Sequence, residues 1–275
     1  MNKIKVVANG EYQINVNQNI IVNDYTKSSE VNKEWLFIYV PSNMDETLDL
    51  KLCNTNTKEK IYILLDDNSK LDLFMIANKQ LPSNYEFKFV IKDNSELVVN
   101  KFYYGNGHHE KLIIDLIGYK SKVYYNLSTV TKDKQKYIMN INHSNQETVS
   151  IINNRGITIN NTALELEING YILKGMKKSV MEQTSKIITL GENYSVIKPN
   201  LFIDENDVSV RHGASIGSFQ KESIFYLQTR GLSKANCYQL LMQAFILSIL
   251  KITEEKKKEL LQIVNIGGEN HECSK

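Results

Sequence analysis

Short segments in which apolar and polar residues alternate recur over most of this chain, from about residue 3 to residue 207. In these segments apolar side chains stand two positions apart, which turns one face of an extended strand toward a core. The clearest examples are 61–65, 85–91, 123–127, 157–159 and 164–168. Asn, Asp, Ser and Gly collect between them, as tight turns require. The pattern predicts a mainly β protein.

Part of this pattern repeats at a fixed interval. The sequence Asp-Asn-Ser-Lys-Leu at 67–71 returns as Asp-Asn-Ser-Glu-Leu at 93–97 and, more loosely, as Tyr-Lys-Ser-Lys-Val at 119–123. A constant period built from strands and turns is typical of a β-solenoid, in which each copy forms one rung around a shared core. The alternative is a β-sandwich whose hairpins reuse the same turn residues.

The spacing of apolar residues becomes helical after Gly217. Three helices are predicted: the first at 222–230, the second at 234–252 with Ser233 as its N-cap, and the third after Thr253. We therefore expect a β-helix core over residues 1–217 and a C-terminal helical domain over residues 218–275 that caps the open end of the solenoid. The segment 240–250 is apolar on more than one face, which favours an additional role in docking a partner.

Composition narrows the class of protein. The net charge of +2 and the scattered lysines indicate neither a nucleic acid nor an anionic membrane as a partner. The N-terminus lacks the apolar core of a signal peptide, and residues 240–250 are too few to span a bilayer. The three cysteines, Cys53, Cys237 and Cys273, form no CxxC pair, which argues against a disulfide framework and against a self-contained metal or cluster site. These features are typical of a cytoplasmic protein.

Few residues are candidates for chemistry, since phosphate-loop, nucleophile-elbow and HExxH motifs are absent. His212 follows a predicted strand and precedes Gly213, so it is either a ligand, a base or a polar group at a bend. The segment 108–110, His-His-Glu, is expected to be a solvated loop whose adjacent histidines point to opposite faces. For His143 we expect a structural hydrogen bond. Acidic residues at 66–67 and 204–207 leave open a carbohydrate-active solenoid enzyme.

Several motifs in the C-terminal half resemble the SufB/SufD family of iron–sulfur cluster assembly proteins, and the SufD branch most. Pro-Asn-Leu-Phe-Ile at 199–203 leads to Asp-Val at 207–208, and His-Gly-Ala-Ser-Ile-Gly at 212–217 resembles the His-Gly-Ala-Thr-Val-Gly of SufD. Phe-Tyr-Leu-Gln-Thr-Arg-Gly at 225–231 is similar to the family's Phe-Tyr-Leu-x-Ser-Arg-Gly signature. The likeness runs from about residue 143 to residue 250. Family members of the SufD type often carry a cysteine where this chain has Val210.

The resemblance implies a right-handed parallel β-helix with a C-terminal helical cap, and a noncatalytic scaffold subunit of the Suf system. Such a subunit docks a SufC-type ATPase through its C-terminal helices and pairs through its β-helix with a SufB-like subunit or a second copy of itself. By this likeness, His212 is the residue that meets iron or a transient iron–sulfur cluster shared with the partner, with no cofactor held tightly. The residues expected to bind the ATPase are Phe225, Tyr226, Leu227, Arg230 and Gly231. A purely structural, self-associating solenoid is a further alternative.

Overall fold

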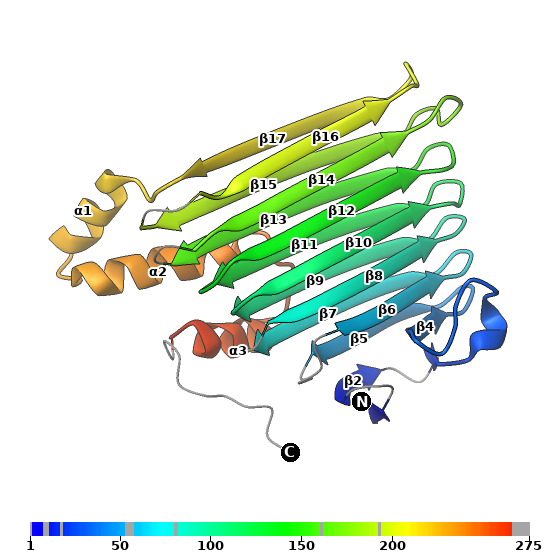
Figure 1. Cartoon of the computed structure of the whole chain (residues 1–275), viewed down its shortest axis with the longest axis horizontal. Helices are drawn as coiled ribbons and strands as arrows, with labels where there is room; N and C mark the ends of the chain where they lie inside the picture. Colours follow the sequence, from blue (N-terminus) through cyan, green and yellow to red (C-terminus); the bar gives the residue numbers. More distant parts are fainter. Residues whose placement is uncertain are drawn as a thin grey trace.

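The structure is a computed structural model that describes residues 2–7, 11–16, 19–52, 58–79, 82–159, 162–191 and 194–265. Side chains are described from residue 19 onward, other than those of residues 58, 78, 79 and 265. Two sheets face each other and form a β-solenoid, and the C-terminal part of the chain forms three helices that lie along it (Figure 1). The predicted fold class, a mainly β solenoid followed by C-terminal helices, is confirmed.

The chain alternates between the two sheets, so that each rung contributes one strand to each. The nine-stranded sheet contains, in spatial order, β1 (Asn2–Val7), β2 (Glu11–Val16), β5 (Asp45–Leu52), β7 (Lys70–Lys79), β9 (Glu96–Gly105), β11 (Lys122–Thr131), β13 (Val149–Ile159), β15 (Val180–Leu190) and β17 (Ser209–Gly217). The eight-stranded sheet contains β16 (Val196–Ile203), β14 (Leu164–Ile172), β12 (Gln135–His143), β10 (His108–Leu116), β8 (Ser83–Ile91), β6 (Lys58–Leu65), β4 (Leu36–Val40) and β3 (Ile21–Val22). A short 3-10 helix, η1 (Tyr25–Lys27), follows β3.

Strand direction divides the solenoid into a short start and a long regular part. The pairs β1–β2, β2–β5 and β3–β4 are antiparallel. From β4 and β5 onward, the described neighbours pair in parallel. The backbone groups of each inner rung therefore bond to the rungs before and after it, and among the strands that the structure describes only those of the first and last rungs leave an edge.

The repeat identified in the sequence marks one corner of the solenoid. Leu71, Leu97 and Val123 are paired in register on β7, β9 and β11, and all three are buried in the core. The residue before each corner serine has a positive φ, 56° at Asn68 and 54° at Asn94, a conformation that asparagine tolerates better than most residues. The rung-by-rung repeat is therefore confirmed.

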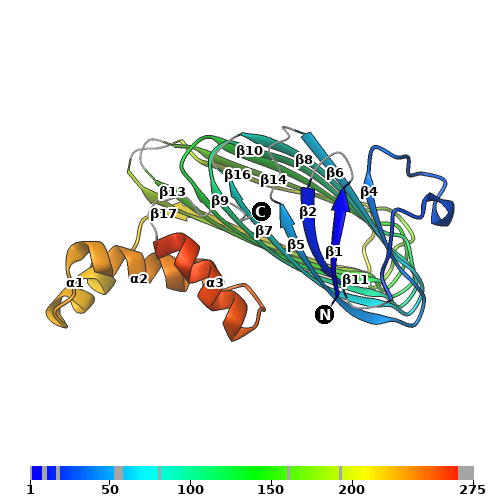
Figure 2. The same cartoon turned by 90° about the horizontal axis from the view of Figure 1, so that it is seen from below.

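The three helices lie outside the two sheets, as Figure 2 shows. They are α1 (Lys221–Thr229), α2 (Lys234–Leu247) and α3 (Glu254–Asn265). A second apolar cluster joins Ile246 and Leu260 to the outward-facing Phe74, Phe102 and Ile157 of the nine-stranded sheet. The helices thus cover the outer face of this sheet, and the last rung, β16 and β17, stays open. The expectation that they cap the open end of the solenoid is therefore wrong, because their apolar side chains pack against the outward-facing side chains of several rungs.

The second helix is shorter than the sequence predicts. It begins after Ser233, whose Oγ accepts a hydrogen bond from the backbone N–H of Asn236, so the predicted N-cap is confirmed. It ends at Leu247, five residues before the expected end. The connector that follows is held by the sheet: Asn100 donates to the carbonyl of Lys251 and accepts from its N–H, at 3.1 and 2.8 Å. These bonds replace the helical bonds that would have continued α2.

Candidate functional site

The last rung of the solenoid presents two strands with a free edge. β17 pairs with β15 alone among the described strands, and β16 with β14 alone. Most residues of β17 are exposed, and Val196, Phe202 and Ile216 leave 41%, 50% and 45% of their surface exposed. An edge of this kind, with apolar side chains beside unpaired backbone groups, is a template for pairing with another chain.

His212 lies on the inner side of this last rung. It is in register with Gln183 of β15, which is buried inside the solenoid, and residues in register on parallel strands point to the same side. Val210, two residues earlier, packs against the main core. His212 itself is exposed, because no further rung covers it. The structure therefore places the predicted residue at the mouth of the solenoid interior.

The described residues give His212 no companion ligands of the usual kind. Within them, three or more His, Cys, Asp or Glu residues do not gather anywhere in a way that would hold a metal ion. Cys237 is buried in α2, where its Sγ lies 3.8 Å from the carbonyl of Leu232. Cys53 and Cys273 lie outside the described residues. One exposed imidazole can supply one ligand to iron, so a cluster bound here would need further ligands besides those that the described residues gather around His212.

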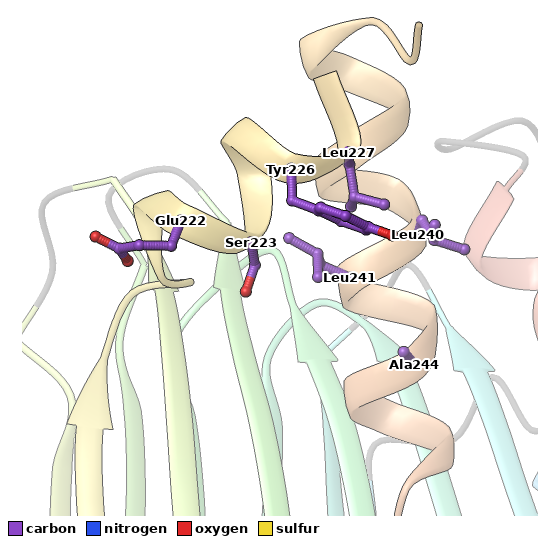
Figure 3. A pocket seen from close by; sticks show the side chains of 7 residues that line it. All are labelled: Glu222, Ser223, Tyr226, Leu227, Leu240, Leu241 and Ala244. Atoms are coloured by element: carbon purple, nitrogen blue, oxygen red, sulfur yellow. The ribbon is translucent and has the colours of Figure 1, made fainter. Parts of the chain in front are cut away.

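A second exposed surface lies between α1 and α2. A groove of about 480 Å³ is lined by Glu222, Ser223, Tyr226, Leu227, Leu240, Leu241 and Ala244. Figure 3 shows the Tyr226 ring between the two helices, beside Leu227 and Leu240. Tyr226 and Leu240 are 57% and 45% exposed. Large apolar side chains gathered around one groove are typical of a docking surface.

The structure brings two of the five predicted docking residues to this groove and a third to its margin. Tyr226 and Leu227 line it, and the guanidinium of Arg230 lies 5.3 Å from the centre of the Tyr226 ring. Phe225 is 68% exposed on the same helix. Gly231 does not line the groove; its φ of 88° ends the α1 segment. The sequence did not single out Leu240, Leu241 and Ala244, although the excess of apolar residues at 240–250 was the signal for them.

The prediction of a solvated loop at 108–110 is wrong. These residues begin β10, and alternation along the strand turns His108 and Glu110 into the core while His109 faces solvent. Glu110 accepts hydrogen bonds from the Nζ of Lys101 at 2.6 Å and the hydroxyl of Tyr103 at 2.9 Å. The two histidines do point to opposite faces, as expected. Gly105 and Gly107 form the corner between β9 and β10, directly before these residues. They made the segment resemble a loop in the sequence.

His143 has the structural role that its sequence context predicts. It is buried, and its two ring nitrogens lie 2.6 Å from the Thr148 hydroxyl and 2.7 Å from the Ser150 hydroxyl. Burial lowers its pKa to about 3. A neutral imidazole therefore ties the end of β12 to the start of β13.

The acidic residues at 66–67 and 204–207 are engaged in turns. Burial raises the pKa of Asp66, but hydrogen bonds from Lys92 and Tyr39 outweigh it and lower the pKa to about 2. Glu205 accepts bonds from the backbone N–H groups of Gly175 and Asp207, which hold its pKa below the usual value. Carboxylates held ionised by turn contacts are unsuited to the role of a general acid. They give no support to the carbohydrate-active alternative.

Comparison with known proteins matches these features to one family. A family model described as "SUF system FeS cluster assembly, SufBD core domain" matches residues 46–245, from the first rungs of the solenoid into α2. Three relatives are named iron–sulfur cluster assembly protein SufD. The protein from Bacillus subtilis is 32% identical over 98 residues, that from Escherichia coli 29% over 87, and that from Plasmodium falciparum 35% over 92.

These alignments are partial on both sides. They take in 34%, 31% and 32% of this chain and 22%, 21% and 6% of the respective relatives. The described part of the chain contains no helix long and apolar enough to cross a membrane. Because the family model spans most of the chain, including the last rung, α1 and most of α2, the chain belongs to the SufBD family of iron–sulfur cluster assembly proteins.

Proposed function

We propose that this chain is a SufD-like, noncatalytic scaffold subunit of a cytoplasmic Suf complex that assembles iron–sulfur clusters. It docks a SufC-type ATPase through α1 and α2 and pairs with a SufB-like subunit through the last rung of the solenoid. The observation that carries the proposal is the position of the two exposed surfaces. Both the groove and the open rung fall within the residues matched by the family model.

The chemistry of the two surfaces fits this division of work. The groove offers aromatic and aliphatic side chains with an arginine at its margin, the composition found at the centre of protein interfaces. The open rung offers a strand edge for pairing and one imidazole, His212. The nascent cluster is the substrate of the complex, and His212 supplies one ligand to it beside ligands from the partner subunit.

The docking assignment is tested by substitution in the groove. Tyr226→Asp and Leu240→Asp each place a charge in the apolar surface, and we expect either change to weaken binding of a SufC-type ATPase by at least tenfold. Leu173→Asp is the matched control, since Leu173 is 57% exposed but follows β14 at the corner away from the helices. Calorimetric titration gives the Kd, and unchanged binding by both groove variants would overturn the assignment.

The role of His212 has its own test. His212→Ala is expected to lower cluster assembly by the reconstituted complex at least tenfold without changing the thermal unfolding temperature, because the side chain is exposed. Assembly at the rate of the unsubstituted complex would leave His212 with a structural role only.

The open last rung also favours a second function, self-association of this chain. The free edges of β16 and β17 are suited to pairing with a second copy of this chain as well as with a SufB-like chain. Light scattering on the purified chain alone distinguishes the two, since only self-pairing gives a dimer without another protein.

A further inference from the structure

Gln183 has a buried acceptor that the fold does not use. It lies on the inner side of β15 and is 1% exposed. Its Nε2 lies 3.5 Å from the carbonyl of Asn200 and 3.7 Å from the Sδ of Met181. Its Oε1 has no hydrogen-bond partner within the part of the chain that the structure describes. Buried side-chain oxygens are rarely left unbonded, so this one calls for a reason.

The opposite sheet leaves space for this side chain. Gly170 of β14 faces Gln183 and Met181 across the interior. A Cβ at Gly170 would lie 2.1 Å from the Sδ of Met181 and 2.8 Å from the Nε2 of Gln183. A larger residue would therefore collide with both side chains. A polar side chain, Gln183, therefore lies inside the apolar core here, and the glycine at position 170 lacks the Cβ atom that would displace it.

The neighbour of Gln183 on the next rung is His212. The two residues are in register on β15 and β17, so their side chains start about 4.8 Å apart and on the same side of the sheet. His212 is the last member of this inward column, which runs from Tyr125 through Ile152 and Gln183. A buried amide side chain with an unused acceptor is thus the neighbour, one rung away, of an imidazole that has two ring nitrogens.

We propose that Gln183 is the positioning residue for His212. The structure does not form this contact; rotation of the two side chains would let the Oε1 of Gln183 accept a hydrogen bond from one ring N–H of His212. That bond selects one tautomer and fixes the plane of the ring. The other ring nitrogen, left without a proton, faces the open end of the solenoid and is free to bind a metal. Orientation of a histidine through its second nitrogen is how proteins usually prepare an imidazole as a ligand. The identity of the metal that His212 binds rests on the proposed function. The contact between Gln183 and His212 does not.

The tautomer of His212 in the isolated chain tests the proposal without any partner. Long-range ¹H–¹⁵N correlation spectra of ¹⁵N-histidine protein at pH 8 are expected to show one dominant tautomer for His212, assigned by loss of its signals in His212→Ala. Gln183→Met, of similar size but without an acceptor, should return the ratio to that of free histidine, and Gln183→Glu should keep one tautomer. A free-histidine ratio in the unsubstituted chain overturns the proposal, even if Gln183→Met does not fold. So does an unchanged ratio in a folded Gln183→Met.

A second measurement links positioning to the substrate. In the reconstituted complex we expect Gln183→Met to lower the rate of cluster assembly about 10- to 100-fold, with ATPase binding and thermal unfolding unchanged. If His212→Ala has no effect on assembly while the tautomer result holds, the proposed role of His212 fails and the Gln183 contact stands. If His212→Ala abolishes assembly and Gln183→Met leaves the rate unchanged, the positioning role fails.

Discussion

His143 lies inside the solenoid between two hydroxyl groups, which makes it a buried neutral base. Since burial lowers its pKa to about 3, the folded protein binds a proton at this ring far less readily than the unfolded chain, where the pKa is about 6.5. The stability that depends on the neutral ring is present above pH 6.5. It is lost as the pH falls from 6.5 toward 3, because the unfolded state takes up the proton first.

We therefore predict that His143→Gln flattens the acid side of the stability curve. Between pH 7.5 and pH 4 the unsubstituted protein should lose roughly 2–3 kcal/mol more of its free energy of unfolding than the variant. Urea titrations at a series of pH values measure this difference. Parallel curves for the two proteins would show that His143 is not the group responsible.

Lys101 and Glu110 form an ion pair with both side chains 0% exposed. Burial lowers the pKa of Lys101 to about 8, and the charge of Glu110 opposes that shift. The Nζ of Lys101 also lies 3.8 Å from the centre of the Phe87 ring and donates to the Tyr125 hydroxyl. A buried pair of this kind is weak evidence of net stabilisation, but either partner alone would be an uncompensated charge in the core.

We predict that removing one partner of this buried pair destabilises the protein more than removing both charges. Lys101→Met should lower the free energy of unfolding by about 3–5 kcal/mol, because Glu110 is left unpaired. Adding Glu110→Gln should recover much of the loss, since the amide keeps an acceptor for Tyr103 without the charge. Denaturant unfolding of the three variants gives the coupling energy. Lys88→Met, which breaks an exposed pair with Glu30, is the control and should change stability by less than about 1 kcal/mol.

At the scale of the elements, the helices are attached to the solenoid by a ladder of asparagines. Asn126 donates to Asn100, and Asn153 donates to Asn126. Asn100 in turn forms both backbone bonds with Lys251, in the connector between α2 and α3. Ion pairs of Lys256 with Asp49 and of Glu259 with Lys51 add contacts farther along α3. This ladder positions α3 and, through the connector, the end of α2.

Removal of the first amide should release the connector. We predict that Asn100→Ala lowers stability by about 1–3 kcal/mol, since the backbone N–H and carbonyl of Lys251 lose their partners. Amide hydrogen exchange in residues 251–265 should become faster. Asn140→Ala is the matched control, because Asn140 belongs to a similar ladder on the other sheet and accepts only from Asn169. Equal exchange in the two variants would contradict the anchoring role.

Some of these elements could be predicted from the sequence and others could not. The corner repeat was visible at Ser69, Ser95 and Ser121 because these rungs share one length. The next corners, at Thr148 and Ser179, lie 27 and 31 residues farther on and escaped detection. Their geometry is the same, with φ values of 56° and 59° at the preceding residues, Glu147 and Lys178. The early end of α2 could not be predicted, because it depends on Asn100, 151 residues away from Lys251.

The sequence also identified part of the candidate site. The motif at 212–217 contains His212, and the signature at 225–231 contains Tyr226 and Leu227, two of the seven residues that line the groove. Gln183 could not be linked to His212 from the sequence, since the two residues become neighbours only through strand register across a whole rung. The buried pair at Lys101 and Glu110 was missed for the same reason. Contacts between rungs leave no local pattern in the sequence.

For the whole molecule, the regular rungs build a rigid column whose last turn is unfinished. The side chains of Leu201, Ile203, Val208 and Val210 pack against the main core yet stay partly exposed. Apolar interior left open at one end is stabilised when another solenoid end covers it. The helices pack along the outer face of the nine-stranded sheet and leave this end free, so the proposed pairing and the proposed ATPase docking use different surfaces.

Pairing through this end should be sensitive to charge there. Ile216, 45% exposed on the inner side of β17, is in register with Ile187. Ile216→Asp is predicted to prevent pairing, by burying an unpaired carboxylate at the interface, while ATPase binding persists. Analytical ultracentrifugation of the variant with each partner measures both. Pairing at unchanged affinity would place the interface elsewhere.

The most direct test of the scaffold function is the mass of the complex formed when this chain is expressed with a SufB-like chain and a SufC-type ATPase. Size-exclusion chromatography with light scattering should give one species that contains this chain paired with the SufB-like chain and ATPase bound to the pair. Tyr226→Asp should remove ATPase from this subunit, and Ile216→Asp should split the pair. Elution of the unsubstituted chain as a monomer, free of both proteins, would contradict the scaffold function.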